Sequence, residues 1–183
     1  MADVTISQLS LATPNSLASI PYSDGSTTYK TSPSGIVAAS PGCILQVVFG
    51  TSSTQVTHTT TFEDTISLPI TIKGISSKVL VIINQHAFTG QDSGYGFRIL
   101  RDSTTIHTSA NTGTNGVQAV GGTRNVQLFN FLNFHYLDTD ALTLNQTYTY
   151  KGQACASTGG TAISNYNVDG GRTSTITLME IAG

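Results

Sequence analysis

The sequence predicts an all-β fold, an antiparallel jelly roll or β-sandwich that follows a short extended arm. From residue 43 on, about ten short runs rich in β-branched and aromatic residues follow one another, separated by turns rich in Gly, Asn, Asp and Ser. No stretch has the 3.6-residue apolar period of an amphipathic helix. A length of 183 residues suits a single domain with a sizeable core.

The composition narrows the classes of partner. Charged residues make up 10% of the chain, the net charge is −2 and 38% of the residues are hydrophobic, which is typical of a folded protein with a neutral, hydroxyl-rich surface. We therefore expect neither nucleic acid nor a membrane as a partner. No basic or apolar leader opens the sequence, so we expect no signal peptide, and we expect Cys43 and Cys155 to be reduced thiols.

Residues 1–42 differ from the rest of the chain, since four of the five prolines lie there and apolar residues are few. Residues 20–30 predict a small hairpin around Asp24-Gly25. A segment of this kind is ordered by docking, so we predict an anchoring arm over residues 1–42 and a β-domain over residues 43–183. The arm residues expected to dock on a partner protein are Ile6, Leu9, Ile20, Tyr22, Asp24, Gly25 and Tyr29.

The strands of the domain are expected at short intervals. A tight hairpin is predicted at residues 101–104, and a long Gly/Asn/Thr loop at residues 109–122. The predicted strands span residues 44–49, 55–61, 66–72, 78–88, 95–101, 104–107, 126–136, 146–155, 161–166 and 173–181.

The central strand is expected at residues 78–88, where Val79 to Ile83 are apolar without a break and four of the five are β-branched. Side chains alternate between the faces of a strand, so this run buries both faces. A buried helix is the alternative, but the β-branched content and the turn residues on either side disfavour it. Residues 126–136 and 174–182 are also apolar on both faces.

A two-layer domain cannot bury both faces of three strands, and large exposed apolar patches are uncommon on monomers. A subunit interface would resolve this; a third layer is the alternative, but the sequence supplies no helix for it. The residues predicted at the interface are Val81, Ile83, Phe129, Phe131, His135, Met179 and Ile181.

At residues 6–9 and 20–30 the chain resembles a segment near the start of tail-fibre and fibre-adaptor proteins of tailed bacteriophages, especially marine and cyanobacterial ones. Residues 41–48, 76–81 and 174–183 are similar to a phage-encoded jelly-roll module like the trimeric tumour-necrosis-factor and C1q heads. The resemblance implies a homotrimeric jelly roll on the virion surface and no catalytic residues. Long fibres carry a shaft, and this chain has none, so both tail and head remain open as locations.

The residues offer no constellation for catalysis, so we expect neither an enzyme nor a bound cofactor. His58, His86, His107 and His135 lack zinc-ligand spacing, although three copies of His135 could meet on a threefold axis. Asp138 and Asp140, with Asn145 after them, could either hold Ca²⁺ or lie in a solvated turn, and the turn is favoured because the loop lacks the glycine and the final acid of an EF-hand.

Three functions remain open. The first is a short trimeric tail fibre or spike, whose arm docks on a tail adaptor or baseplate and whose head is displayed for attachment to the host surface. The second is a capsid decoration, cement or head-fibre protein bound to the major capsid protein, and the third is a cytokine-like binding module. Loops on a rigid sandwich commonly carry recognition, here of a host-surface glycan. The candidate receptor residues are Gln91, Asp92, Tyr95, Asn111, Asn115 and Arg124.

Overall fold

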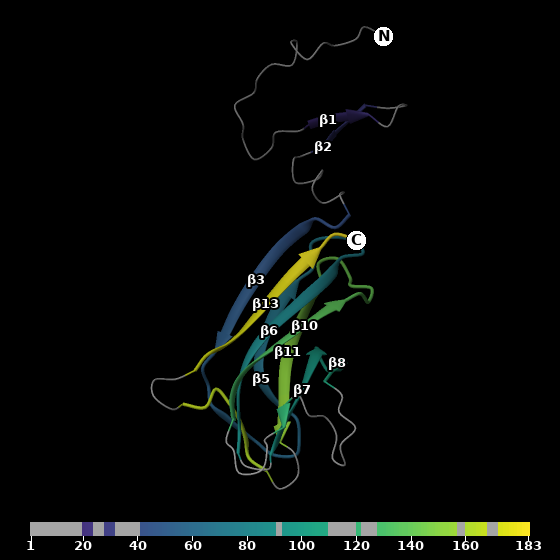
Figure 1. Cartoon of the computed structure of the whole chain (residues 1–183). Coiled ribbons are helices and arrows are strands. Elements are labelled where there is room, and N and C mark those ends of the chain that lie inside the picture. The colour runs from purple at the N-terminus through teal and green to yellow at the C-terminus, as the bar shows by residue number, and fades with distance from the viewer. Residues whose placement is uncertain are drawn as a thin grey trace.

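The computed structural model describes residues 20–23, 28–31, 41–90, 93–109, 120–121, 128–156, 160–167 and 172–183. Within these ranges the chain forms thirteen strands and no helix (Figure 1). The predicted all-β fold is confirmed. Over the same ranges, no helix is long and apolar enough to cross a membrane.

Two antiparallel sheets make up the body of the domain (Figure 1). In the first sheet four long strands lie side by side in the order β3 (Ile44–Ser52), β13 (Ser174–Ile181), β6 (Lys78–Thr89) and β10 (Leu128–Asp138). The short strands β12 (Ala162–Ser164) and β4 (Val56–His58) extend it beyond the end of β13. The second sheet has the order β5 (Glu63–Thr71), β11 (Thr147–Ala156), β7 (Gly94–Arg101) and β8 (Thr104–Thr108), and β9 (Val120–Gly121) also pairs with β7.

The chain order of these strands makes the sandwich a jelly roll. In chain order, the strands β3, β5, β6 and β7 alternate between the two sheets. The strands β8, β10, β11 and β13 alternate in the same way. Among these eight strands, only β7 and β8 are consecutive neighbours within one sheet, and their hairpin turns between Arg101 and Thr104, as the sequence predicts. Eight strands in two sheets connected in this way are the jelly-roll pattern.

A separate two-stranded sheet precedes the domain. β1 (Ile20–Ser23) and β2 (Thr28–Thr31) pair antiparallel, with Tyr22 opposite Tyr29, so the predicted hairpin is confirmed. Its turn residues Asp24 and Gly25, and the predicted docking residues Ile6 and Leu9, lie outside the described residues.

The core fills the space between the two sheets. From β6 it takes the alternate residues Val79, Val81 and Ile83, each 0% exposed. Across from them lie the buried side chains of the second sheet, with further contributions from β13: Ile66, Ile70, Tyr95, Phe97, Ile99, Tyr150, Ile176 and Leu178. This alternation leaves the other face of the first sheet outside the core.

One buried carboxylate closes the end of the sandwich. Glu180 on β13 is 0% exposed and accepts hydrogen bonds from the backbone N–H groups of Lys73 (2.9 Å) and Gly74 (2.8 Å). The side-chain amide of Gln46 on β3 donates both to Glu180 (2.5 Å) and to the Thr71 carbonyl (2.6 Å). Burial alone would raise the pKa of Glu180, but the donors, Gln46 first, hold it below its usual value.

The predicted strand positions are close to the observed ones, with two instructive differences. The short strand β9 lies inside the predicted loop 109–122. The strand predicted at residues 126–136 is observed at Leu128–Asp138. It runs on to an acidic residue because Asp138, 1% exposed, is neutralised by Arg101 and bonded by Tyr150.

Candidate interaction surface

The outer face of the β3–β13–β6–β10 sheet, the side turned away from the core, is the candidate functional surface. Strand pairing arranges its side chains in rows. One row joins Val47, Met179, Leu80 and Leu137, and the next joins Phe49, Thr177, Ile82 and His135. A third row is wholly polar and joins Thr51, Thr175, Asn84 and Asn133.

On one side of the polar row the face is apolar and open. Phe49 is 62% exposed and Val47 53% exposed, although aromatic and β-branched side chains of this size are usually buried. Among the outward positions that the structure describes on these four strands, only Lys78 is charged. We call this region the apolar part: Ile44, Val47, Phe49, Leu80, Ile82, Leu137, Met179 and Ile181.

On the other side of the polar row lies a cluster of rings, the aromatic part: His86, Phe88, Phe129, Phe131, Tyr166 and Arg172. Phe88 packs against Tyr166 with ring centroids 4.6 Å apart and against Phe129 at 4.9 Å. Phe129 and Phe131 project to solvent, 43% and 58% exposed.

His86 lies within this aromatic part, edge-on to Phe131 at 5.2 Å, and is 0% exposed. Among the described residues, neither ring nitrogen has a hydrogen-bond partner. Burial, and then repulsion from the Arg172 guanidinium, lowers the pKa of His86, so the ring is neutral at pH 7. A buried polar group without a partner costs about 1–3 kcal/mol, which makes this side chain an exception to be explained.

The structure separates the predicted interface residues into two groups. Phe129, Phe131, His135, Met179 and Ile181 all lie on the outer face, where a second subunit could reach them. That they form an interface stays a prediction.

The prediction that Val81 and Ile83 lie at a subunit interface is wrong. Both are 0% exposed and belong to the core of a single chain, so neither side chain can contact another subunit. The outward residues of β6 are the neighbours one position along, Leu80 and Ile82.

Of the predicted receptor residues, the structure describes only Tyr95, and this prediction is wrong. Tyr95 is 0% exposed, and its hydroxyl lies 2.5 Å from the Ser164 hydroxyl in the interior. Burial raises its pKa well above the ordinary value. The other candidates lie outside the described residues: Gln91, Asp92, Asn111, Asn115 and Arg124.

Near Tyr95 lies a serine–histidine–carboxylate series that the sequence does not reveal, because its members are far apart in the chain. The distance from His58 Nε2 to Ser164 Oγ is 2.7 Å, and from His58 Nδ1 to Glu63 Oε2 it is 3.4 Å. Ser164 is 0% exposed and its hydroxyl also contacts Tyr95, so no substrate can approach the oxygen in this fold. Through these contacts Ser164 on β12 is joined to His58 on β4 and to Tyr95 on β7.

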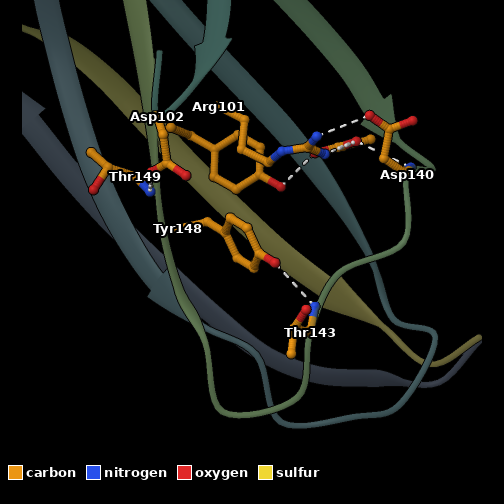
Figure 2. Close-up of polar contacts among 8 residues, drawn as sticks. Arg101, Asp102, Asp140, Thr143, Tyr148 and Thr149 are labelled. Carbon is orange, nitrogen blue, oxygen red and sulfur yellow. Dashed lines mark hydrogen bonds and ion pairs between the residues drawn. The ribbon is translucent and has the colours of Figure 1, made fainter. Parts of the chain in front are cut away.

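The acidic turn after β10 is held by Arg101 (Figure 2). The guanidinium donates to Asp138 at 2.7 Å and to Asp140 at 2.9 Å, and the Tyr150 hydroxyl donates to Asp138 at 2.7 Å. Asp138 is therefore buried and paired, not solvated as the sequence suggests. The two carboxylates face an arginine and not an open loop, and among the described residues no three His, Cys, Asp or Glu side chains gather in an arrangement for a metal ion.

A groove of about 320 Å³ lies where β3 ends and β5 begins. The carboxylate of Asp64 is bound by Lys151 at 3.0 Å and by Gln153 at 2.5 Å, and the Thr65 hydroxyl is bonded to Gln85. The groove is thus hydroxyl-lined, with its charged group already paired. Its lining residues are Thr51, Ser52, Thr54, Val56, Asp64, Thr65, Ile66 and Ser67.

No protein-family model and no curated protein matches the chain. Solved structures with a similar chain trace include the VP2 subviral particle of infectious bursal disease virus, with 14% identity, a TM-score of 0.47 and coverage of 90% of this chain and 38% of that chain. The Gt strain structure of the same virus has 14% identity, a TM-score of 0.40 and coverage of 90% and 43%. This chain thus spans less than half the length of the proteins it matches.

Proposed function

We propose that this chain is a structural protein of a bacteriophage virion surface, a short fibre or spike that self-associates through the apolar part of the outer face. The exposed apolar rows on β3, β13, β6 and β10 carry the proposal. Three copies is the number that the resemblance to phage jelly-roll modules implies.

The size and chemistry of the outer face support self-association. Four strands about 4.8 Å apart and about eight residues long give a face of roughly 19 by 26 Å, or about 500 Å². Exposed patches of about 300–600 Å² are the largest that monomers usually carry and commonly serve an interface. Charged side chains are depleted at interface cores, and Lys78 is the one charge at the described outward positions of these strands.

The roles proposed for the arm and for the displayed head rest on the sequence. Residues 1–42 would dock the protein on the virion, and the head would be displayed for attachment to a host-surface glycan. Deleting residues 2–30 should leave an assembled head that no longer joins virions. A head that unfolds without these residues would show that the arm belongs to the core.

The assembly state is tested by sedimentation velocity on the full chain at micromolar concentration. We expect a mass three times the 19.2 kDa of one chain. Val47→Glu places a charge in the apolar part and should give monomers. Leu144→Glu, at a position that is 40% exposed in the loop after β10, is the matched control and should leave the mass unchanged. A monomeric wild type would contradict self-association.

The location on the virion is tested by counting copies against the major capsid protein with quantitative mass spectrometry. A handful to a few dozen copies supports the fibre or spike. Hundreds of copies, in a simple ratio to the capsid protein, would instead identify a capsid decoration protein. Absence from purified virions would contradict both.

A further inference from the structure

Arg172 is the cation of the aromatic part. Among the described residues no Asp or Glu lies within ion-pair distance of its guanidinium, whereas Arg101 binds two carboxylates. Its guanidinium lies 5.5 Å from the Phe129 ring centroid, and the side chain is half-buried. The planar fork of donors is thus held beside an exposed ring and is available to an anion.

His86 supplies a second, independent observation in the same place. It is 0% exposed and lies beside the exposed ring of Phe131, and neither ring nitrogen has a hydrogen-bond partner in the part of the chain that the structure describes. A neutral imidazole carries one donor and one acceptor, the pair that a hydroxyl group satisfies. A ligand that enters beside Phe131 therefore needs hydroxyl groups as well as a negative charge.

The rings supply the third requirement. Phe129 and Phe131 alternate with Asn130 along β10, so their exposed rings lie on the same side of the sheet. The face of an aromatic ring carries partial negative charge and attracts the weakly positive C–H groups of a flat, hydroxylated ring. Ligand sites commonly combine such apolar walls with a few fixed polar groups.

We propose that the aromatic part of the outer face binds an acidic saccharide, a sugar ring that carries a carboxylate, as in a uronic acid. Arg172 binds the carboxylate, and Phe129 and Phe131 support the ring. His86, which is 0% exposed, exchanges hydrogen bonds with its hydroxyl groups once the exposed ring of Phe131 turns aside. This inference rests on the proposed function, because attachment to a host surface is what brings such a glycan to the protein. It assigns recognition to the sheet face and not to the loops.

The polar row divides this site from the subunit contact. Asn84 donates to Thr175 at 3.2 Å, and Asn133 lies directly opposite Asn84 on β10. Burying these amide and hydroxyl groups without new hydrogen bonds would cost free energy, so the row stays in contact with water. The row therefore marks the edge of the self-association surface. The aromatic part then stays open in the assembled protein.

The test uses two sugars that differ only in the carboxylate, methyl β-D-glucuronide and methyl β-D-glucoside, titrated into the full chain and followed by NMR chemical shifts. We expect the glucuronide to bind at least about tenfold more tightly, the gain from one charge-assisted bidentate contact. Arg172→Gln should remove this preference. Arg98→Gln is the matched control, because Arg98 also stacks on an aromatic ring, Phe62 at 4.2 Å, but is bonded to Gln153 on the second sheet.

Phe131→Ser separates ligand binding from assembly. Since Phe131 is 58% exposed, the variant should fold, bind both sugars several-fold more weakly and keep the wild-type mass in sedimentation. Equal affinity for the two sugars, or an unchanged preference in Arg172→Gln, would overturn the saccharide site. A lower mass in Phe131→Ser would also overturn it, by showing that the aromatic part is a subunit contact. A monomeric wild type that prefers the glucuronide would leave the site standing and contradict only the self-association.

Discussion

Replacing Glu180 with Gln tests the buried carboxylate that fastens β13 to the turn before β6. The two carboxylate oxygens together accept from the Gln46 amide and from the backbone N–H groups of Lys73 and Gly74. Only one oxygen remains in Gln. The cheaper orientation keeps that oxygen on the two backbone donors and turns the new amide towards Gln46, so that two N–H donors face each other.

The cost follows from these contacts. A buried donor left without an acceptor costs about 1–3 kcal/mol, and a hydrogen bond to a charged acceptor, worth about 1.5–3 kcal/mol, becomes a neutral one worth about 1 kcal/mol. Gln46 keeps its bond to the Thr71 carbonyl, which limits the loss. We therefore expect Glu180→Gln to lower the free energy of unfolding by about 2–4 kcal/mol, or the melting temperature by about 5–15 °C.

The assay is urea unfolding of the wild type and the variant between pH 3 and pH 7. The pKa of Glu180 is lowered in the folded state, so its contribution is present above the unfolded value of 4.5 and is lost as pH falls through the folded value. The difference between the two proteins should therefore shrink in acid. Asp140→Asn, at a 66% exposed carboxylate in a surface ion pair with Arg101, is the control and should change little. A gap below about 1 kcal/mol at pH 7, or one that is constant with pH, would refute the reasoning.

Two further predictions concern other buried groups. Tyr150→Phe removes a hydroxyl that donates to Asp138 at 2.7 Å and should cost about 1–3 kcal/mol in urea unfolding, with no change in the assembled mass; an unchanged midpoint would contradict the bond. Burial lowers the pKa of His58 and His86 below 6.5, so the unfolded chain binds more protons between the folded values and 6.5. The unfolding midpoint should therefore fall as pH drops from 7 to 5, and a rising midpoint over that range would contradict the assignment.

Fold class and strand positions could be predicted because short β-branched runs and turn residues are local signals. Which side of β6 faces the core could not, because Val79 to Ile83 are apolar at every position. Lys78 and Asn84 are polar and exposed, so they mark the outward side of β6. Gln85 is also polar, but it is on the side that faces the core. Its polar side chain is buried because Thr65 and Ser174 bond it, and neither partner can be identified from the sequence.

Tyr95 shows the same limit for the candidate site. It follows a Gly-rich stretch and has a polar hydroxyl, features typical of a recognition loop, yet the hydroxyl finds Ser164 across the sandwich and the side chain is buried. Arg172 shows the opposite case, because the sequence gives no signal for it. A single arginine in a Gly-rich stretch carries no pattern, and only the fold brings it beside Phe129 on a strand more than forty residues earlier.

The three strands that are apolar on both faces lead to the central physical conclusion. β13 and β6 are neighbours and β10 lies beside β6, so their outward side chains merge into one surface instead of three separate strips. A core can cover only one side of that sheet. The same sequence property that predicts a partner therefore also predicts the face of the sheet on which that partner would bind. The polar row through Asn84 allows two partners to use this face side by side, a second copy on the apolar part and a carboxylate-bearing sugar on the aromatic part.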